Sequence, residues 1–276
     1  MSEPIGEAIR SEESDPTDLP LASYLASMPR KYRRLFGAAA DALGAEESGR
    51  VTCTAAIRAH AAIVARRGKR AAHAEIWKPL PPGGAALCVA ADDAPGLLAR
   101  IAAAMVAHSF DVVAAQVYCR ARADGVVEAV DFFWVRRVGP PPSSPGPSEG
   151  NIETSDVASL AQTLGELVRG GAGLERLRQL APVVEGKGAH SRVGFESDPC
   201  DGAMVLTVQG TDRPGLLFVI SQALFSEGAR ITHSDVATHE GRVLDRFHLS
   251  EMDGAPLRRA RLLGIQTAVI ASLDDL

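Results

Sequence analysis

The sequence lacks the features that mark a membrane-spanning, secreted or nucleic-acid-binding protein. No apolar run reaches the roughly 18 residues that a membrane-spanning helix needs. The first residues, MSEPIGEAIRSEESD, have neither the basic start nor the apolar middle of a secretion signal. A formal net charge of −5 at pH 7 provides no broad basic field for nucleic acid. We therefore expect a soluble, cytoplasmic protein that binds neither nucleic acid nor membrane.

The spacing patterns of disulfides and metal centres are also missing. The four cysteines are widely separated and form no Cys-x-x-Cys pair: Cys53, Cys88, Cys119 and Cys200. Buried thiols are the simpler interpretation. Three histidines near the C-terminus, His233, His239 and His248, follow no known ligand spacing, and strand alternation predicts that some of them lie on opposite faces. We expect no bound metal and no cofactor.

The sequence has no recognisable catalytic constellation. Ser234 follows His233 without an orienting carboxylate at a recognisable site. No glycine pair is followed by the Lys-Ser/Thr of a P-loop. Catalysis by this chain is therefore not expected.

What the sequence does contain is an internal repeat. DDAPGLLARIAAAM (92–105) and TDRPGLLFVISQAL (211–224) share an Asp-x-Pro-Gly motif, and their Asp residues are 212 − 93 = 119 positions apart. Further along, EAVDFFWV aligns with RVLDRFHL at an offset of 245 − 131 = 114, which indicates a shorter hairpin in the second copy. Each motif follows a short apolar run and begins a helical pattern, as at a strand-to-helix junction.

The patterns predict an α+β fold with the same element order, βαββα, in both copies. In the first copy, the predicted strands are 85–91, 112–120 and 126–135, and the helices are 97–108 and 155–169. In the second copy, the strands are 203–209, 231–238 and 242–252, and the helices are 216–227 and 257–271. We expect residues 191–195 to be the last strand of the first copy. Nothing remains after the last helix of the second copy to complete its sheet.

The flanking segments suggest how the chain is divided. Residues 1–20 are poor in large apolar groups and are expected to be disordered. Residues 21–72 have helical composition, broken at Met28-Pro29, and form a helical connector. We expect a first domain at 73–196, with a Pro-rich insertion at 137–150, and a second at 200–276. Basic residues gather near the start of the connector, and a solvated helix face explains them better than a docking surface for an acidic partner: Arg30, Lys31, Arg33 and Arg34.

The repeated motif has two possible uses. Asp before the helix can cap its first amides, Pro suits the first turn, and Gly allows close approach of a backbone or a small ligand. Free amides at a helix start could also hold the carboxylate of an amino acid, with Asp93 or Asp212 near its ammonium group. On the residues alone, the helix cap is the commoner use.

Resemblance to known families adds to this interpretation. The segments ALCVAADDAPGLLARIAAAMVAHSFDVVAAQVYCR and MVLTVQGTDRPGLLFVISQALFSEGARITHSDV resemble a tandem pair of ACT domains, ferredoxin-like βαββαβ modules that bind amino acids. With YLASMPRKY, AHAAIVARRG and HAEIWKPLPPGG upstream, residues 21–276 are similar to the C-terminal part of the bifunctional protein-PII uridylyltransferase/uridylyl-removing enzyme family, which senses glutamine. The catalytic domains of that family use a Gly-Ser turn and a His-Asp metal pair, and neither dipeptide occurs here.

The resemblance implies a binding site where ACT domains meet, between the loop before the first helix and the start of the next strand. The first copy contributes Asp93, Pro95, Gly96 and Leu97 with Asp111, Val112, Val113 and Ala114. The second contributes Asp212, Pro214, Gly215 and Leu216 with Arg230, Ile231, Thr232 and His233. The family often has Asn where this chain has Asp111 and Arg230. The side-chain contact of that Asn with the ligand is therefore not expected here, whereas backbone contacts with the ligand could survive the change.

These observations imply a non-catalytic sensor of a free amino acid, by resemblance glutamine, in nitrogen regulation. The implied partners are a catalytic or PII-type protein, and a second copy or ACT–ACT pairing. One alternative is the regulatory part of a protein-PII uridylyltransferase/uridylyl-removing enzyme. The other is an ACT-based dimerisation module without a ligand.

Overall fold

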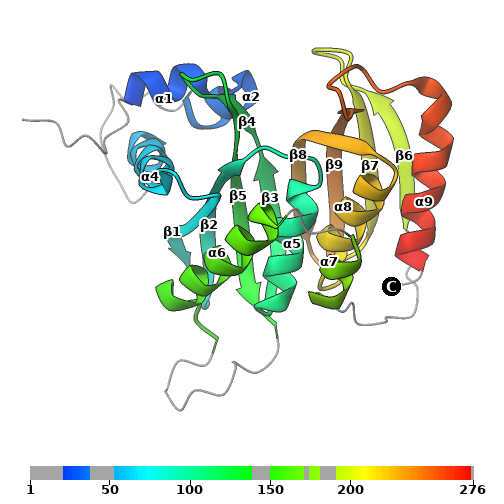
Figure 1. Cartoon of the computed structure of the whole chain (residues 1–276). Helices are drawn as coiled ribbons and strands as arrows, with labels where there is room; N and C mark the ends of the chain where they lie inside the picture. Colours follow the sequence, from blue (N-terminus) through cyan, green and yellow to red (C-terminus); the bar gives the residue numbers. More distant parts are fainter. Residues whose placement is uncertain (1–20, 38–52, 139–149, 171–173, 181–190, 275–276) are drawn as a thin grey trace, which may run out of the picture.

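The computed structural model describes residues 21–37, 53–138, 150–170, 174–180 and 191–274. The disorder predicted for 1–20 and most of the Pro-rich insertion (139–149) lie outside these ranges. A nine-stranded antiparallel sheet runs through the molecule, with helices packed on it (Figure 1), so the expected α+β class is confirmed at that level. None of the helices in the described parts has the length and apolarity needed to cross a membrane.

The first copy of the repeat forms one half of the sheet, in the spatial order β1-β2-β5-β3. Its strands are β1 (Ala72–Leu80), β2 (Gly84–Asp92), β3 (Phe110–Val117) and β5 (Val127–Arg137), and the short β4 (Cys119–Ala121) also pairs with β5. Its helices are α5 (Leu97–Ala107), α6 (Thr154–Arg169) and α7 (Leu174–Leu180).

The second copy forms the other half, in the order β8-β9-β7-β6. Its strands are β6 (Arg192–Ser197), β7 (Met204–Thr211), β8 (Ala229–His239) and β9 (Arg242–Glu251). Helix α8 (Leu216–Ser226) follows β7, and a 3-10 turn, η2 (Arg259–Arg261), leads into α9 (Leu262–Asp274).

Both copies complete their sheets from the N-terminal side. Strand β6 contains residues 191–195 except Ser191, and it pairs with β7 from Arg192↔Gln209 to Ser197↔Met204. Assigning this strand to the first copy is therefore wrong. In the first copy, β1 holds the equivalent edge beside β2. Each unit thus has the order ββαββα, not βαββαβ: the edge strand joins its neighbour through a short local turn, which satisfies the exposed strand edge at little entropic cost.

The two halves join side by side. Strand β3 pairs with β8 from Ala114↔Ala237 to Val117↔Ser234, so the sheet is continuous from one unit to the other. Helix α5 packs on α8 across this junction. The glycine of each copy lies against the first helix of the other copy. A Cβ added to Gly96 would meet Phe225, and a Cβ added to Gly215 would meet Val106, which is the residue equivalent to Phe225 in the repeat. The units are therefore related by an approximate two-fold axis.

The N-terminal helices cover the other face of the first unit. They are α1 (Leu21–Ser27), α2 (Arg30–Tyr32), a π-helical segment η1 (Arg33–Gly37) and α4 (Cys53–Arg67). The predicted break at Met28-Pro29 falls between α1 and α2. Tyr32 stacks on Phe132 of β5, and its hydroxyl lies 3.0 Å from His60 Nδ1.

Strand composition reflects this covering. In β5, the run Val130–Val135 is apolar apart from Asp131, because both faces of the strand are buried. The equivalent strand β9 has the polar residues Arg246 and His248 at the positions that Phe132 and Trp134 hold in β5. A buried ionic cluster anchors α4 to the first unit: Glu128 receives both Arg67 and Arg120, at 2.6 Å for the Arg120 Nη2 pair.

Candidate functional site

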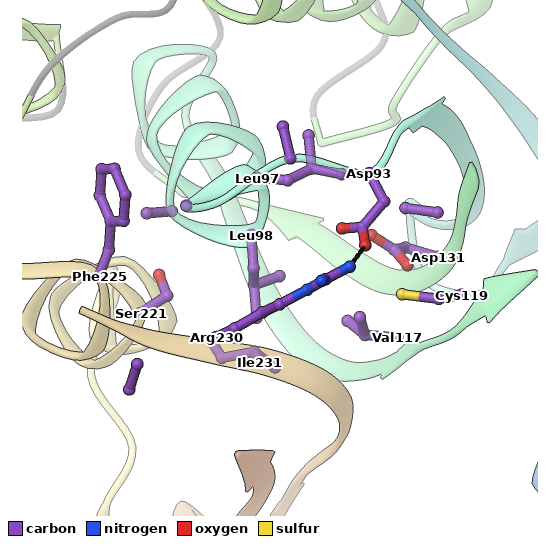
Figure 2. A pocket seen from close by; sticks show the side chains of 15 residues that line it. Asp93, Leu97, Leu98, Val117, Cys119, Asp131, Ser221, Phe225, Arg230 and Ile231 are labelled. Atoms are coloured by element: carbon purple, nitrogen blue, oxygen red, sulfur yellow. Dashed lines mark hydrogen bonds and ion pairs between the residues drawn. The ribbon is translucent and has the colours of Figure 1, made fainter. Parts of the chain in front are cut away.

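Two small hollows flank the junction between the units. The first hollow has a volume of about 30 Å³ and lies between the β2–α5 loop and the start of β8 (Figure 2). The second hollow has about 20 Å³ and lies between the β7–α8 loop and the start of β3. Volumes of this size suit a small number of water molecules. The hollows beside Gly96 and Gly215 exist, but as they stand they are not large enough for an amino acid.

The loop beside each hollow is a tight turn, not a side-chain cap. Gly96 has φ +74° and ψ 15°, and Leu97 N donates to Ala94 O at 3.0 Å, as in a type II turn with Pro95 at its second position. Gly215 repeats this with φ +83° and ψ 1°, and Leu216 N donates to Arg213 O at 3.1 Å. The N-cap positions are the glycines themselves, and the Asp93 carboxylate pairs with Arg230.

This turn leaves helix-start amides beside each hollow. The first intrahelical bond of α5 runs from Arg100 N to Gly96 O. The amides of Leu98 and Ala99 precede this bond, and among the described residues no backbone oxygen outside the helix accepts a hydrogen bond from either of them. Both residues line the first hollow. Leu217 and Phe218 stand in the same relation to the second hollow. Such amides can hold an anion.

Each hollow combines one loop with the strand start of the other copy. Asp93 and Gly96 face Arg230 and Ile231, which belong to the second copy. In the second hollow the same exchange brings the Asp212 loop to Asp111 and Val112. The structure thus places each loop beside the strand start of the other copy, and not beside that of its own copy as the sequence analysis grouped them. The reason is that antiparallel β3–β8 pairing places the start of each edge strand beside the loop of the neighbouring unit.

An internal ion pair crosses the first hollow. The guanidinium of Arg230 reaches from β8 to the Asp93 carboxylate, as Figure 2 shows. The ring of Phe225 packs on Gly96. Beneath them Asp131 is fully buried and accepts a hydrogen bond from Tyr118 N at 3.2 Å; burial raises its pKa well above the usual range. The position that a ligand's ammonium group could take beside Asp93 is therefore already occupied by the guanidinium of Arg230.

The second hollow is more acidic. Asp111 and Asp212 share Arg136, whose Nη2 lies 2.7 Å from Asp111 Oδ2 and 3.5 Å from Asp212 Oδ2. Burial and the neighbouring Asp111 raise the pKa of Asp212. Asp245 is 1% exposed, its Oδ1 has no partner among the described residues, and burial raises its pKa to about 7. This hollow has carboxylates available for an ammonium group.

Six of the residues selected from the sequence do not line either hollow: Pro95, Pro214, Val113, Ala114, Thr232 and His233. His233 instead lies on the opposite face of the sheet, beside a larger cavity described below. Asp131 and Asp245 were missed. Their equivalence in the repeat, at an offset of 114, was visible in the sequence, but their direction into the hollows depends on strand register.

Comparisons with known proteins bear on what such a site could do. No protein-family model matches the chain. A bifunctional uridylyltransferase/uridylyl-removing enzyme of Rhodospirillum rubrum is 30% identical over 195 residues, covering 68% of this chain and 19% of the relative. The enzymes of the same name from Phenylobacterium zucineum and Gluconobacter oxydans are each 28% identical, over 79% and 71% of this chain.

The chain is similar to one part of the bifunctional uridylyltransferase/uridylyl-removing enzymes. It spans about a fifth of the length of these relatives, between 19% and 22% in the three comparisons. The similarity is consistent with the resemblance to their C-terminal part. The match therefore concerns only that fifth of each relative, and it assigns no activity of the remaining four fifths to this chain.

Proposed function

We propose that this chain is a regulatory module that senses a free amino acid through two ACT-type units, with glutamine as the first ligand to test. The supporting observation is the pair of hollows at the junction, each lined by helix-start amides of one unit and the strand start of the other. The amides suit an α-carboxylate, and the nearby carboxylates suit an α-ammonium group. Similarity to the uridylyltransferase/uridylyl-removing enzymes adds support for a regulatory role.

We assign the ligand to the second hollow. In the first hollow, Arg230 already neutralises Asp93, so an incoming ammonium group would have to displace a guanidinium. In the second, Asp245 has an unpartnered carboxylate oxygen among the described residues, and Asp212 shares the cation Arg136 with Asp111. An ammonium group would relieve both the excess negative charge and the missing hydrogen bond.

Binding must be coupled to movement, because the hollow is smaller than an amino acid. The walls of the second hollow come from both units: α8 and its loop on one side, and α5 and β3 on the other. A ligand that enters would separate these walls and favour a different arrangement of α5 against α8. By linkage, any partner that recognises one arrangement would then respond to the amino acid.

Calorimetric titration of the full chain with each of the twenty amino acids tests the proposal. Asp212→Asn should weaken binding about 10- to 100-fold, because a hydrogen bond to a charged group contributes about 1.5–3 kcal/mol. Asp93→Asn is the matched control and should leave the affinity unchanged. The absence of binding heat for all twenty amino acids at millimolar concentration would refute amino-acid sensing. Binding that is lost only in Asp93→Asn would refute the choice of hollow.

The similarity favours one further candidate, the regulatory part of a protein-PII uridylyltransferase/uridylyl-removing enzyme. This candidate predicts that the purified chain does not modify PII protein with UTP and magnesium, but changes the rate when separate catalytic domains are added. Uridylylation by the chain alone would contradict it. A module that only dimerises would instead self-associate in light scattering and give no heat with any amino acid.

A further inference from the structure

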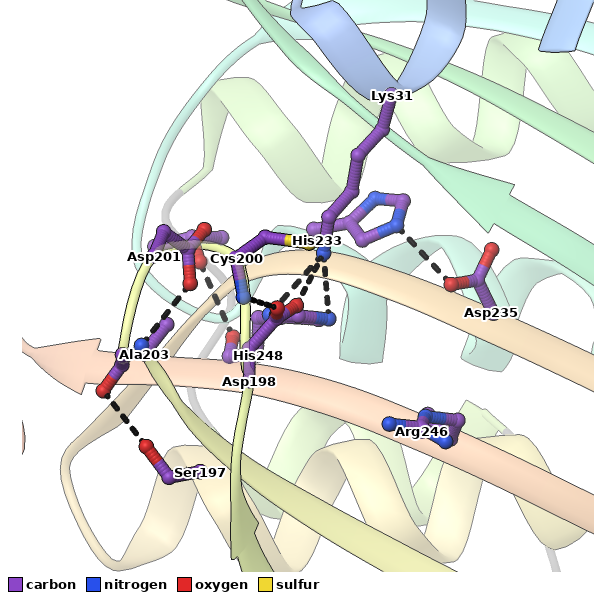
Figure 3. A network of polar contacts seen from close by, with 12 residues as sticks. Lys31, Ser197, Asp198, Cys200, Asp201, Ala203, His233, Asp235, Arg246 and His248 are labelled. Atoms are coloured by element: carbon purple, nitrogen blue, oxygen red, sulfur yellow. Dashed lines mark hydrogen bonds and ion pairs between the residues drawn. The ribbon is translucent and has the colours of Figure 1, made fainter. Parts of the chain in front are cut away.

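A second cluster of polar side chains lies on the opposite face of the sheet from the hollows. His233 of β8 and His248 of β9 are direct cross-strand partners, and their ring centroids are 5.1 Å apart. Asp235 follows on the same face of β8, and Asp198 reaches the cluster from the end of β6 (Figure 3). These histidines show no metal-ligand spacing along the chain, because strand pairing, not sequence distance, brings them together.

The orientation of His233 is set by the backbone. Its Nδ1 lies 2.7 Å from the carbonyl oxygen of Val117, which can only accept, so Nδ1 carries the proton. In the neutral ring, the Nε2 lone pair then faces Asp235 Oδ2 at 3.1 Å. Two acceptors facing each other require a proton or a cation between them. A backbone carbonyl that fixes the tautomer is also the usual outer partner of a metal-binding histidine.

The other members of the cluster present acceptor atoms to a cation. Lys31 Nζ, which can only donate, lies 2.8 Å from His248 Nε2, so this nitrogen offers a lone pair. The Asp198 carboxylate is held in place by Cys200 N, which donates to it at 2.8 Å. Asp198, Asp201 and His248 form a second group of possible ligands, whose candidate atoms also lie within 4.8 Å of one another.

A cation of the protein itself occupies the centre of the cluster. Lys31 extends from α2 and places its Nζ 2.8 Å from His248 Nε2 and 3.1 Å from Asp198 Oδ2. Lys31 therefore does not sit on a solvated helix face as the basic run suggested. Its side chain is still 37% exposed, and a cavity of about 350 Å³ opens beside it, lined also by Tyr118 and Gln116. The ammonium group has room to leave.

We propose that His233, Asp235 and His248 form a site for a divalent cation of the zinc class, which takes the place of the Lys31 ammonium group. The candidate ligand atoms of these three residues all lie within 4.8 Å of one another. Zinc holds N and O ligands at about 2.0–2.2 Å, which requires only a modest contraction of side chains. Two imidazoles favour zinc-class ions over magnesium or calcium, and water can provide the fourth ligand.

Metal binding here would release a contact between distant parts of the chain. Lys31 is the residue through which α2 reaches Asp198 and His248 of the second unit. Displacing it would uncouple the N-terminal helices from that unit without disturbing their packing on the first, which involves Tyr24, Met28 and Tyr32. The inference is independent of the amino-acid site, because none of its residues lines either hollow.

Titration of the full chain with cobalt(II), read by its visible absorption, and competition by zinc test the proposal. We expect one ion per chain and a loss of at least tenfold in affinity for both His233→Ala and His248→Ala. His239→Ala, an exposed histidine at the end of β8, is the matched control and should bind as the unmodified chain does. Circular dichroism of each variant checks that the fold is retained.

Lys31→Met gives a second, opposite readout. It removes the competing charge and keeps a flexible side chain, so we expect zinc to bind at least tenfold more tightly. Absence of cobalt or zinc binding in both the unmodified chain and Lys31→Met would overturn the proposal. Binding that persists in both histidine variants, or that is lost equally in His239→Ala, would overturn it as well.

Discussion

Replacing each repeated glycine with alanine tests whether the two units pack as the structure describes. Gly96 and Gly215 have the same left-handed backbone, with φ of +74° and +83°. Their surroundings differ: a Cβ at Gly96 would lie 2.8 Å from three ring atoms of Phe225, whereas at Gly215 the nearest atom is Val106 Cγ2 at 3.7 Å. The two substitutions should therefore have unequal costs.

The magnitude follows from two separate contributions. An alanine in the left-handed region costs about 1–2 kcal/mol at either position. Overpacking against a ring adds about 1–3 kcal/mol, and the ring of Phe225 cannot shift freely because the guanidinium of Arg100 lies over it at 5.7 Å. We expect Gly215→Ala to lose about 1–2 kcal/mol of unfolding free energy and Gly96→Ala to lose about 2–5 kcal/mol.

Urea denaturation followed by circular dichroism measures both values. Gly125→Ala is the control, since Gly125 has φ +81° and a Cβ added there would meet nothing within 4 Å; it should cost the same as Gly215→Ala. In a double-mutant cycle, Phe225→Ala should relieve the additional cost of Gly96→Ala. Equal losses for all three glycine variants, or no coupling to Phe225, would show that α5 and α8 do not pack as described.

Two further predictions concern the face covered by the N-terminal helices. Glu128→Gln should lower the unfolding free energy by about 3–5 kcal/mol, because it leaves the buried guanidinium of Arg120 without a counter-charge and leaves that of Arg67 with only the half-exposed Asp92; Arg122→Gln, which breaks exposed pairs, should cost less than about 1 kcal/mol in the same urea assay. Burial lowers the pKa of His60 to about 3, so the unfolded chain takes up a proton below about pH 6.5 that the native chain does not, and stability falls as the pH drops from 6.5 towards 3. His60→Phe should therefore flatten the melting temperature over this range, and an unchanged acid slope would contradict the burial of a neutral imidazole.

Local features of the fold could be predicted because they depend on neighbouring residues. The type II turns at Pro95-Gly96 and Pro214-Gly215 follow from side-chain chemistry within four positions, and the strands and helices around them follow from hydrophobic periodicity. The candidate site was predicted only in part. The two loops and the strand starts selected from the sequence do line the hollows, but the sequence did not show which loop meets which strand start.

Partner choice could not be predicted because it depends on non-local contacts. Strand 191–195 was compatible with either unit by composition, and only its hydrogen bonds to β7 assign it to the second. The ion pair between Arg230 and Asp93 joins residues 137 positions apart, and no spacing rule connects them. The same holds for His233 and His248, which meet through the register of β8 and β9.

The sequence by itself determined that this protein is built twice from one unit, with a glycine turn before the first helix of each. Those properties arise from backbone preferences and apolar periodicity, which act over a few residues. Tertiary structure alone decided that the sheet is completed from the N-terminal side, that each hollow is shared between units, and that one hollow contains an internal cation while the other is acidic. These properties arise from strand pairing and from charges brought together across the junction, and such contacts have no counterpart in the local pattern of the chain.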